Sequence, residues 1–184
     1  MPHNGFMRSN NHVFSGAHGT IYSSCIMKNG FTILPVATGS CMFGAGIYFY
    51  ANDVDGRWLA YKWAELRANE LNVSPAKASV VSVDISFGDN KFFRWGEEEE
   101  KRIFTMLKEQ QRNVPDTRLT RKLQNEMRER WLAYIISKMP DGCVLILTDL
   151  PLPPHTSMHG IRRYPGCVVR DVSILPPPPY KKEL

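Results

Sequence analysis

The sequence predicts an α+β domain in which short strands form a split sheet flanked by helices. Its 184 residues fit one domain. Hydrophobic residues make up 43% of the chain and charged residues 22%, which is sufficient for a packed core and argues against global disorder. Strands and helices alternate, but the strands are short and their connections lack regular βαβ spacing. This pattern favours a split sheet over a doubly wound one.

The first half of the chain contains the clearest elements. Residues 1–12 are polar and are expected to form a flexible arm. Apolar residues three to four positions apart, including Trp58 and Tyr61, predict a helix, and strict alternation over 81–87 predicts a strand. The predicted elements are a strand over 13–20, a helix over 22–29, extended chain over 31–34, an aromatic strand over 47–50, a helix over 57–71 and a strand over 78–87.

The second half is expected to complete the domain, which spans 13–176, and to add a helical insertion over about 97–139. Residues 97–100 are all glutamate, and acidic side chains complement the first turn of a helix. The predicted elements are extended chain over 91–95, helices over 97–112 and 118–139, a buried strand over 143–148, a proline-rich loop over 151–159 and a last strand over 168–175. Residues 177–184 are expected to form a proline-rich tail.

Composition and charge restrict the classes of protein. The net charge is +5 with a pI near 9.1, which permits an anionic partner without requiring one. The four cysteines show no C-x-x-C spacing, so no metal site is expected. No signal peptide is apparent, and no apolar run reaches about 18 residues. We therefore expect no membrane association and a cytoplasmic location, or delivery into the cytoplasm of a target cell.

Two short motifs predict the walls of one nucleotide pocket. His18, Gly19 and Thr20 end the first strand, where an imidazole can hydrogen-bond a ribose hydroxyl and a glycine backbone can pair with a carboxamide. Residues 40–50 combine a glycine turn with an aromatic strand, and glycine lets a flat ligand lie against the backbone. Each motif alone is equally typical of an ordinary turn or a core hairpin. Their combination favours a binding site.

The combined pattern resembles a known family. The chain carries, in this order, His18-Gly19-Thr20, Gly30-Phe31, Phe43-Gly44-Ala45-Gly46-Ile47-Tyr48-Phe49, and Tyr61. These residues resemble the catalytic domain of poly(ADP-ribose) polymerase-like, diphtheria-toxin-type ADP-ribosyltransferases, and the likeness covers residues 14–64. It implies split antiparallel β-sheets with flanking helices. It also implies a mono-ADP-ribosyltransferase, of the kind found among bacterial toxins and effectors, that transfers ADP-ribose from NAD to a protein or nucleic acid and releases nicotinamide.

The resemblance implies a role for each matched residue. His18 would bind the adenosine-side ribose of NAD, and the backbone of Gly19 would pair with the nicotinamide carboxamide. Tyr48 and Tyr61 would hold the nicotinamide ring between them, and Thr20 would be a further cofactor-binding residue. His18 and Tyr48 would also be catalytic residues. Such a pocket acts by orientation and charge stabilisation.

The sequence also departs from the family. Trp58 stands where the family has a serine, and the spacing from Tyr48 to Tyr61 is about two residues longer. The late glutamate of the polymerising members is missing, because no acidic residue lies between Asp149 and Asp171. A rough alignment places His159 near that position, as a third catalytic candidate or as an ordinary loop histidine. The missing glutamate argues against chain elongation.

The acceptor and two rival functions stay open. Basic residues over 118–130 predict either a contact with an acceptor such as nucleic acid or a solvated helix face. An RNA 2′-phosphotransferase would share the fold and the His-Gly-Thr motif, but the Arg-x-His-x-His element of such enzymes is absent. The second alternative is a module that binds NAD or ADP-ribose without turnover.

Overall fold

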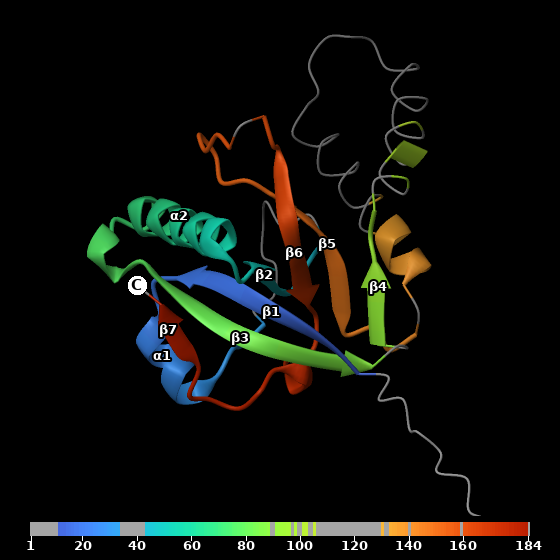
Figure 1. The fold of residues 1–184 in the computed structure, drawn as a ribbon, viewed down its shortest axis with the longest axis horizontal. Helices are drawn as coiled ribbons and strands as arrows, with labels where there is room; N and C mark the ends of the chain where they lie inside the picture. The colour runs from blue at the N-terminus through green and yellow to red at the C-terminus, as the bar shows by residue number, and fades with distance from the viewer. Residues whose placement is uncertain are drawn as a thin grey trace, which may run out of the picture.

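The computed structural model describes residues 11–33, 43–88, 91–96, 98, 101, 102, 105, 130, 133–139, 141–158 and 160–183. The predicted α+β class is confirmed (Figure 1). The elements are β1 (Asn11–Thr20), α1 (Ser23–Asn29), β2 (Ile47–Ala51), α2 (Val54–Glu70), η1 (Pro75–Lys77), β3 (Ser79–Gly88), β4 (Phe92–Arg94), β5 (Leu145–Pro151), β6 (Arg163–Val169), η3 (Val172–Ile174) and β7 (Lys181–Glu183).

The strands that the structure describes form one seven-stranded sheet in the order β4-β5-β6-β2-β1-β3-β7. Neighbouring strands are antiparallel, except that β4 and β5 are parallel. β1 pairs with β3 along its whole length, whereas its pairing with β2 comprises Gly16 opposite Ala51 and Ala17 opposite Tyr50 in the described residues. The structure thus has one sheet where the resemblance predicts two, and its narrowest point is the junction of β1 with β2.

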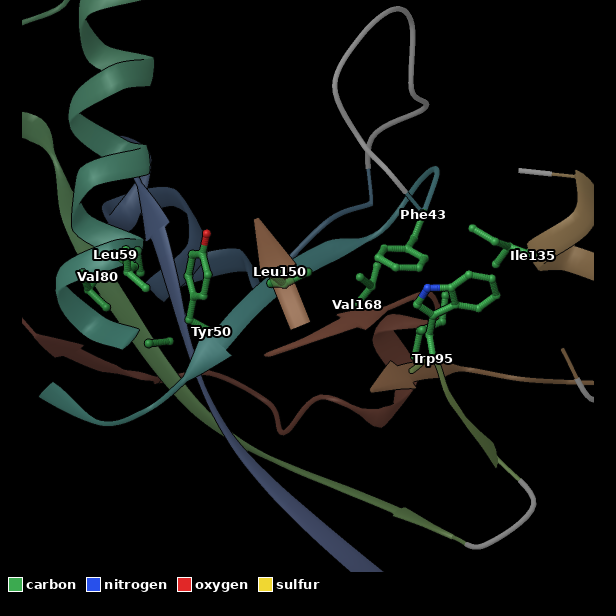
Figure 2. Close-up of a cluster of buried hydrophobic side chains, with 11 residues drawn as sticks. Phe43, Tyr50, Leu59, Val80, Trp95, Ile135, Leu150 and Val168 are labelled. Carbon is green, nitrogen blue, oxygen red and sulfur yellow. The ribbon is translucent and has the colours of Figure 1, made fainter. Parts of the chain in front are cut away.

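The core consists of two clusters on opposite faces of this sheet. Successive residues of a strand point to opposite faces, so Tyr48 and Tyr50 pack on the cluster beneath α2 while Phe49 packs on the other. Figure 2 shows the first cluster, with Leu59 and Tyr50 close to α2 and a second group of side chains near β4. That second group comprises Phe43, Trp95 and Ile135.

α2 packs closely on β1. The helix begins at Val54, three residues before the predicted start, because Asp53 caps it by accepting a hydrogen bond from the Gly56 N–H at 2.7 Å. Apart from Leu59, its buried residues are all small: Gly56, Ala60, Ala64 and Ala68. The backbones approach so closely that a Cβ atom added at Gly19 would lie 1.7 Å from the Ala60 carbonyl oxygen. Small residues on both elements make this approach possible.

The C-terminal part differs from the predictions in two places. The predicted strand over 168–175 is wrong: β6 begins at Arg163, and the chain turns where Asp171 caps η3 by accepting from the Ser173 N–H at 2.9 Å. Residues 177–184 were predicted to be a tail outside the domain. Instead, Tyr180 is buried, and the residues after it form β7, which pairs with β3. Proline has no N–H to donate to a ladder, so pairing begins only after Pro179.

Several predictions fall outside the described residues. They concern residues 1–10 of the arm, most of the insertion over 97–139, the basic helix over 118–130 apart from Arg130, and His159. Asn11 and His12, predicted to belong to the arm, are the first residues of β1. Among the residues that can be described, no helix combines the length and apolar character needed to cross a membrane.

Candidate functional site

The two sequence motifs meet where β1 and β2 separate. Nδ1 of His18 lies 2.9 Å from the backbone carbonyl oxygen of Tyr48. Since a carbonyl oxygen only accepts hydrogen bonds, Nδ1 carries the proton and donates it. Burial lowers the pKa of the His18 imidazole, and the bond to the Tyr48 backbone opposes this to a smaller extent. The imidazole is therefore neutral near pH 7, and its Nε2 is a hydrogen-bond acceptor.

Aromatic rings hold the His18 imidazole on the face of the sheet opposite α2. The centroid of the Phe31 ring lies 5.3 Å from the centroid of the imidazole, at an interplanar angle of 82°. Phe49 of β2 lies 5.5 Å from it, with a tilted ring. Two apolar rings and one hydrogen bond together fix the plane of the imidazole. The remaining nitrogen thus has a defined direction.

Gly19 presents its peptide groups to the gap between the two strands. The Asn52 N–H donates to the Ser15 carbonyl at 3.0 Å, so Ser15 directs its peptide groups toward the β2 side. The direction of the backbone N–H and C=O groups repeats every second residue of a strand. Gly19, four residues after Ser15, therefore also directs its N–H and C=O toward the β2 side. In the described structure the ladder between β1 and β2 stops at Ala17. Gly19 thus offers one N–H and one C=O at the open edge, the complement of an amide.

Thr20 completes the first motif in a structural role. Its hydroxyl oxygen accepts from the Tyr22 N–H at 2.9 Å, and its carbonyl accepts from the Ser79 hydroxyl at 3.2 Å. The side chain is buried. These bonds turn the chain from β1 into α1 and tie the end of β1 to β3.

Tyr48 closes the glycine turn that precedes its own strand. Its hydroxyl donates to the Gly44 carbonyl at 3.0 Å and lies 3.1 Å from the Phe43 N–H, which donates to it. Gly44 has a φ of 77°, a conformation that favours glycine. The Tyr48 ring packs on the cluster beneath α2. The hydroxyl thus shapes the turn, and the ring forms part of the wall next to the gap.

Trp63, which the sequence motifs do not single out, lies on the flank of α2 that faces β2. Its indole Nε1–H donates to the Tyr50 hydroxyl at 2.7 Å, and that hydroxyl donates to the Pro151 carbonyl. Burial raises the pKa of Tyr50 to about 12, so the phenol stays protonated and able to donate. The signal in the sequence was the spacing of Trp63 from Leu59, one helical turn earlier and fully buried.

Tyr61 lies on the opposite flank of the same helix. Residues four apart on a helix share one side, and Arg57 forms an ion pair with Glu183 of β7 at 3.1 Å between Nε and Oε2. The Arg57 flank, with Tyr61, therefore faces β3 and β7. The residue of α2 against Gly19 is Ala60, not Trp58. Helix geometry thus places Tyr61 on the flank opposite Trp63, and both side chains pack on the cluster that Tyr48 also contacts.

The strand beside Tyr48 supplies no carboxylate. Val168 of β6 lies opposite Tyr48, and β6 contains no acidic residue. The carboxylate of Asp171 caps η3, and Asp149 lies on β5 opposite Pro165. Neither replaces the missing glutamate next to Tyr48.

A separate groove of about 450 Å³ lies on the outer side of α2. Trp58, Lys62 and Glu65 line it from the helix, and Pro153 and His155 line it from the chain after β5. The Lys62 ammonium pairs with the Glu65 carboxylate at 2.6 Å. None of His18, Gly19, Tyr48 and Tyr61 lines this groove among the described residues. Trp58 thus belongs to the groove and not to the gap between β1 and β2.

A scan of protein-family models finds none that matches the chain, and a search of curated proteins finds no similar sequence. The candidate site thus depends on its own motifs and geometry.

Proposed function

We propose that the chain is an NAD-dependent mono-ADP-ribosyltransferase that modifies a protein or nucleic acid and releases nicotinamide. The observation that supports this best is the hydrogen bond between His18 Nδ1 and the Tyr48 carbonyl at the open edge of β1. This contact places the acceptor nitrogen of His18 close to the peptide groups of Gly19 and to the ring of Tyr48. These are the parts that the family resemblance assigns to NAD binding, and a sheet that narrows between β1 and β2 is consistent with that family's split sheets.

The geometry suits the donor NAD in the following way. The carboxamide of nicotinamide is an amide, so it can donate to the Gly19 carbonyl and accept from the Gly19 N–H. Nε2 of His18, on the other face of the sheet, accepts from a ribose hydroxyl. The dinucleotide then lies across the junction of β1 and β2.

Such binding prepares the bond between ribose C1′ and the nicotinamide nitrogen for cleavage. Nicotinamide leaves with the bonding electron pair as a neutral molecule, and positive charge develops on the ribose. The acceptor nucleophile forms the new bond to C1′ and loses its proton to solvent. The protein contributes orientation and exclusion of water from the ring, not a covalent intermediate.

Trp63 is the better candidate for the ring that stacks on nicotinamide from the helix. Tyr61 exceeds the family spacing by about two residues, whereas Trp63 exceeds it by about four, or roughly one helical turn. An insertion of one turn keeps a residue on the same face, and an insertion of half a turn does not. The same shift puts Ala60 where the family serine contacts the carboxamide, which accords with the contact of Ala60 on Gly19.

A second candidate function is binding of NAD or ADP-ribose without turnover. The absence of an acidic residue from β6 favours it, because no carboxylate there can polarise an acceptor. The same absence is expected of an enzyme that transfers one ADP-ribose unit and does not extend a chain. Only the release of nicotinamide distinguishes the two.

The test measures NAD binding by calorimetry and nicotinamide release by chromatography, with transfer of labelled ADP-ribose to lysate followed by protease or nuclease. We expect release by the wild type and a loss of about 100-fold in His18→Ala, since a positioned polar group contributes about 2–4 kcal/mol to such steps. His155→Ala is the matched histidine control, because that exposed side chain lies in the groove outside the gap. Binding without release would establish the binding module. No binding of NAD by the wild type would refute both functions. Equal nicotinamide release by His18→Ala and wild type would refute the site proposed at His18.

A further inference from the structure

The C-terminal strand runs behind the part of β1 that carries the candidate site. Lys182 of β7 lies opposite Val81 of β3, which in turn lies opposite His18 of β1. In the same way, Glu183 of β7 lies opposite Val80 of β3, and Val80 lies opposite Gly19 of β1. The last strand is therefore in register with the two site residues across the sheet.

A row of aromatic rings links this strand to the imidazole. The Tyr180 ring centroid lies 5.1 Å from that of Phe31, and Phe31 lies 5.3 Å from His18. Phe49 contacts both Phe31, at 5.3 Å, and His18, at 5.5 Å. Tyr180 and Phe31 are each 8% exposed, and Phe49 is fully buried. Because buried rings pack at close to crystal density, displacement of one is transmitted to its neighbours.

Tyr180 is held on both sides. A hydrogen bond from the Phe31 backbone reaches its hydroxyl and partly offsets the rise in the Tyr180 pKa that burial causes. On the other side, Glu183 pairs with Arg57 of α2, which anchors β7 three residues further on. The Tyr180 ring thus has little freedom to move away from Phe31.

We propose that Tyr180 is a positioning residue for His18 and acts through Phe31. The edge-to-face contact with Phe31 sets the plane of the imidazole about its bond to the Tyr48 carbonyl, and Tyr180 supports Phe31 from behind. Removal of the Tyr180 ring allows Phe31 to retreat, so the imidazole tilts and Nε2 loses its direction. Its effect on NAD binding rests on the function proposed above, whereas the effect on the imidazole does not.

The experiment compares Tyr180→Leu with Phe87→Leu in the full chain. Phe87 is the matched control, because it belongs to the same core cluster and is buried, but its ring neighbours are His12 and Phe92 at the other end of β3. Both variants lose one buried ring of similar size. Tyr180→Phe removes the hydroxyl alone. The first readout is the NMR shift of the His18 ring protons, assigned with His18→Gln, which reports the position of the Phe31 ring without any ligand. The second is the Kd for NAD by calorimetry.

We expect Tyr180→Leu to shift the His18 ring protons while Phe87→Leu leaves them unchanged at equal loss of stability. The Kd for NAD should rise about threefold to tenfold in Tyr180→Leu, the range that one aromatic contact accounts for, with less than about a twofold change in Phe87→Leu. In Tyr180→Phe, both the His18 ring-proton shift and the Kd for NAD should lie between the values of the wild type and of Tyr180→Leu.

Equal His18 shifts in the two leucine variants would overturn the proposal, whether or not the wild type binds NAD. A selective shift in a protein that does not bind NAD would support the positioning role and reject the proposed function. If Tyr180→Leu does not fold, Tyr180→Phe and Tyr180→Met carry the same comparison, and the absence of any selective shift in them would also overturn it.

Discussion

His18 shows how a single residue can have both its charge and its direction fixed by the fold. Its Nδ1–H is bound to a backbone carbonyl, which no substitution of the Tyr48 side chain removes directly. The lowered pKa keeps the ring neutral, and two phenylalanine rings determine its plane. A histidine held in this way is prepared to accept one hydrogen bond in one direction.

At the same scale, Trp63→Ala and Tyr61→Ala separate the two candidates for the helix ring. We expect Trp63→Ala to lower kcat/KM for NAD by about 10-fold to 100-fold, because stacking of a flat heterocycle on an aromatic side chain contributes about 1–3 kcal/mol. Trp63→Phe, which keeps a ring, should recover part of this loss. Steady-state kinetics of nicotinamide release gives both constants.

Tyr61→Ala serves as the control, with an expected change below about threefold, since Tyr61 lies on the flank that faces β3 and β7. The opposite order of effects would mean that the ring from Tyr61 reaches the nicotinamide. In that case the one-turn insertion inferred for α2 would be wrong.

At the residue scale, the sequence predicted which two motifs lie together, whereas the nucleotide pocket that they were predicted to form stays a prediction. His-Gly-Thr and the glycine turn ending in Tyr48 were predicted to meet, and Nδ1 of His18 does contact the Tyr48 backbone. The side of α2 on which an aromatic residue lies was not predictable, because Tyr61 continues an apolar spacing from Trp58 while Trp63 continues one from Leu59. Only the contacts of Arg57 and Trp63 with other strands resolve it.

At the scale of elements, the approach of β1 to α2 determines where the open edge lies. Ala60 contacts Gly19 through its backbone, so α2 covers one face of β1 at the point where β2 leaves. A larger residue at either position would hold the helix away from the strand. The floor of the candidate site is therefore set by two small residues.

The matched pair Gly19→Ala and Gly88→Ala tests this approach. A Cβ at Gly19 would lie 1.7 Å from the Ala60 carbonyl oxygen, whereas no described atom lies within 4 Å of the equivalent position at Gly88. We expect Gly19→Ala to lower the free energy of unfolding by about 1–3 kcal/mol, as overpacking does. Gly88→Ala should change it by less than about 1 kcal/mol. Urea denaturation followed by circular dichroism measures both.

Equal stabilities of the two variants would show that α2 moves away from β1 without cost. The activity of Gly19→Ala, measured at a temperature where it is folded, should also fall. Gly88→Ala lies at the far end of β3 and should retain the wild-type rate.

Elements were predictable from sequence where their period was strong. The alternation within β3 and the apolar spacing of α2 located both to within three residues. β6 was misplaced, because its alternation is interrupted by Pro165 and Gly166 while the apolar residues continue past Val169. β7 was missed because three residues carry no period of their own, and its place is set by the burial of Tyr180.

At the scale of the whole molecule, the half-buried imidazole of His18 makes the stability of the fold depend on pH. The folded-state pKa of His18 is lowered by burial, so as pH falls the unfolded chain takes up the proton first. The stabilising contribution is complete above the ordinary pKa of about 6.5 and is lost as pH falls from there through the folded value.

We therefore expect the urea midpoint to fall between pH 7.5 and pH 5.5 and the fall to be smaller in His18→Gln. Comparison of the two slopes isolates the contribution of His18, because the two proteins differ at that residue alone. A midpoint difference between wild type and His18→Gln that is independent of pH would show that the imidazole is protonated as readily in the fold as in the unfolded chain. Chemical denaturation at five buffered pH values suffices.

The junction of β1 with β2 links recognition to the integrity of the sheet. Two residue pairs join the strands in the part that the structure describes, and Gly19, the next residue of β1 whose peptide groups face β2, has its ladder position open. A carboxamide is chemically a peptide group without its chain. One that docks on Gly19 would act as an extra rung that extends the sheet across its narrowest point. A ligand bound in this way would hold β1 and β2 together. Slower hydrogen exchange of the backbone amides in both strands would therefore report its binding.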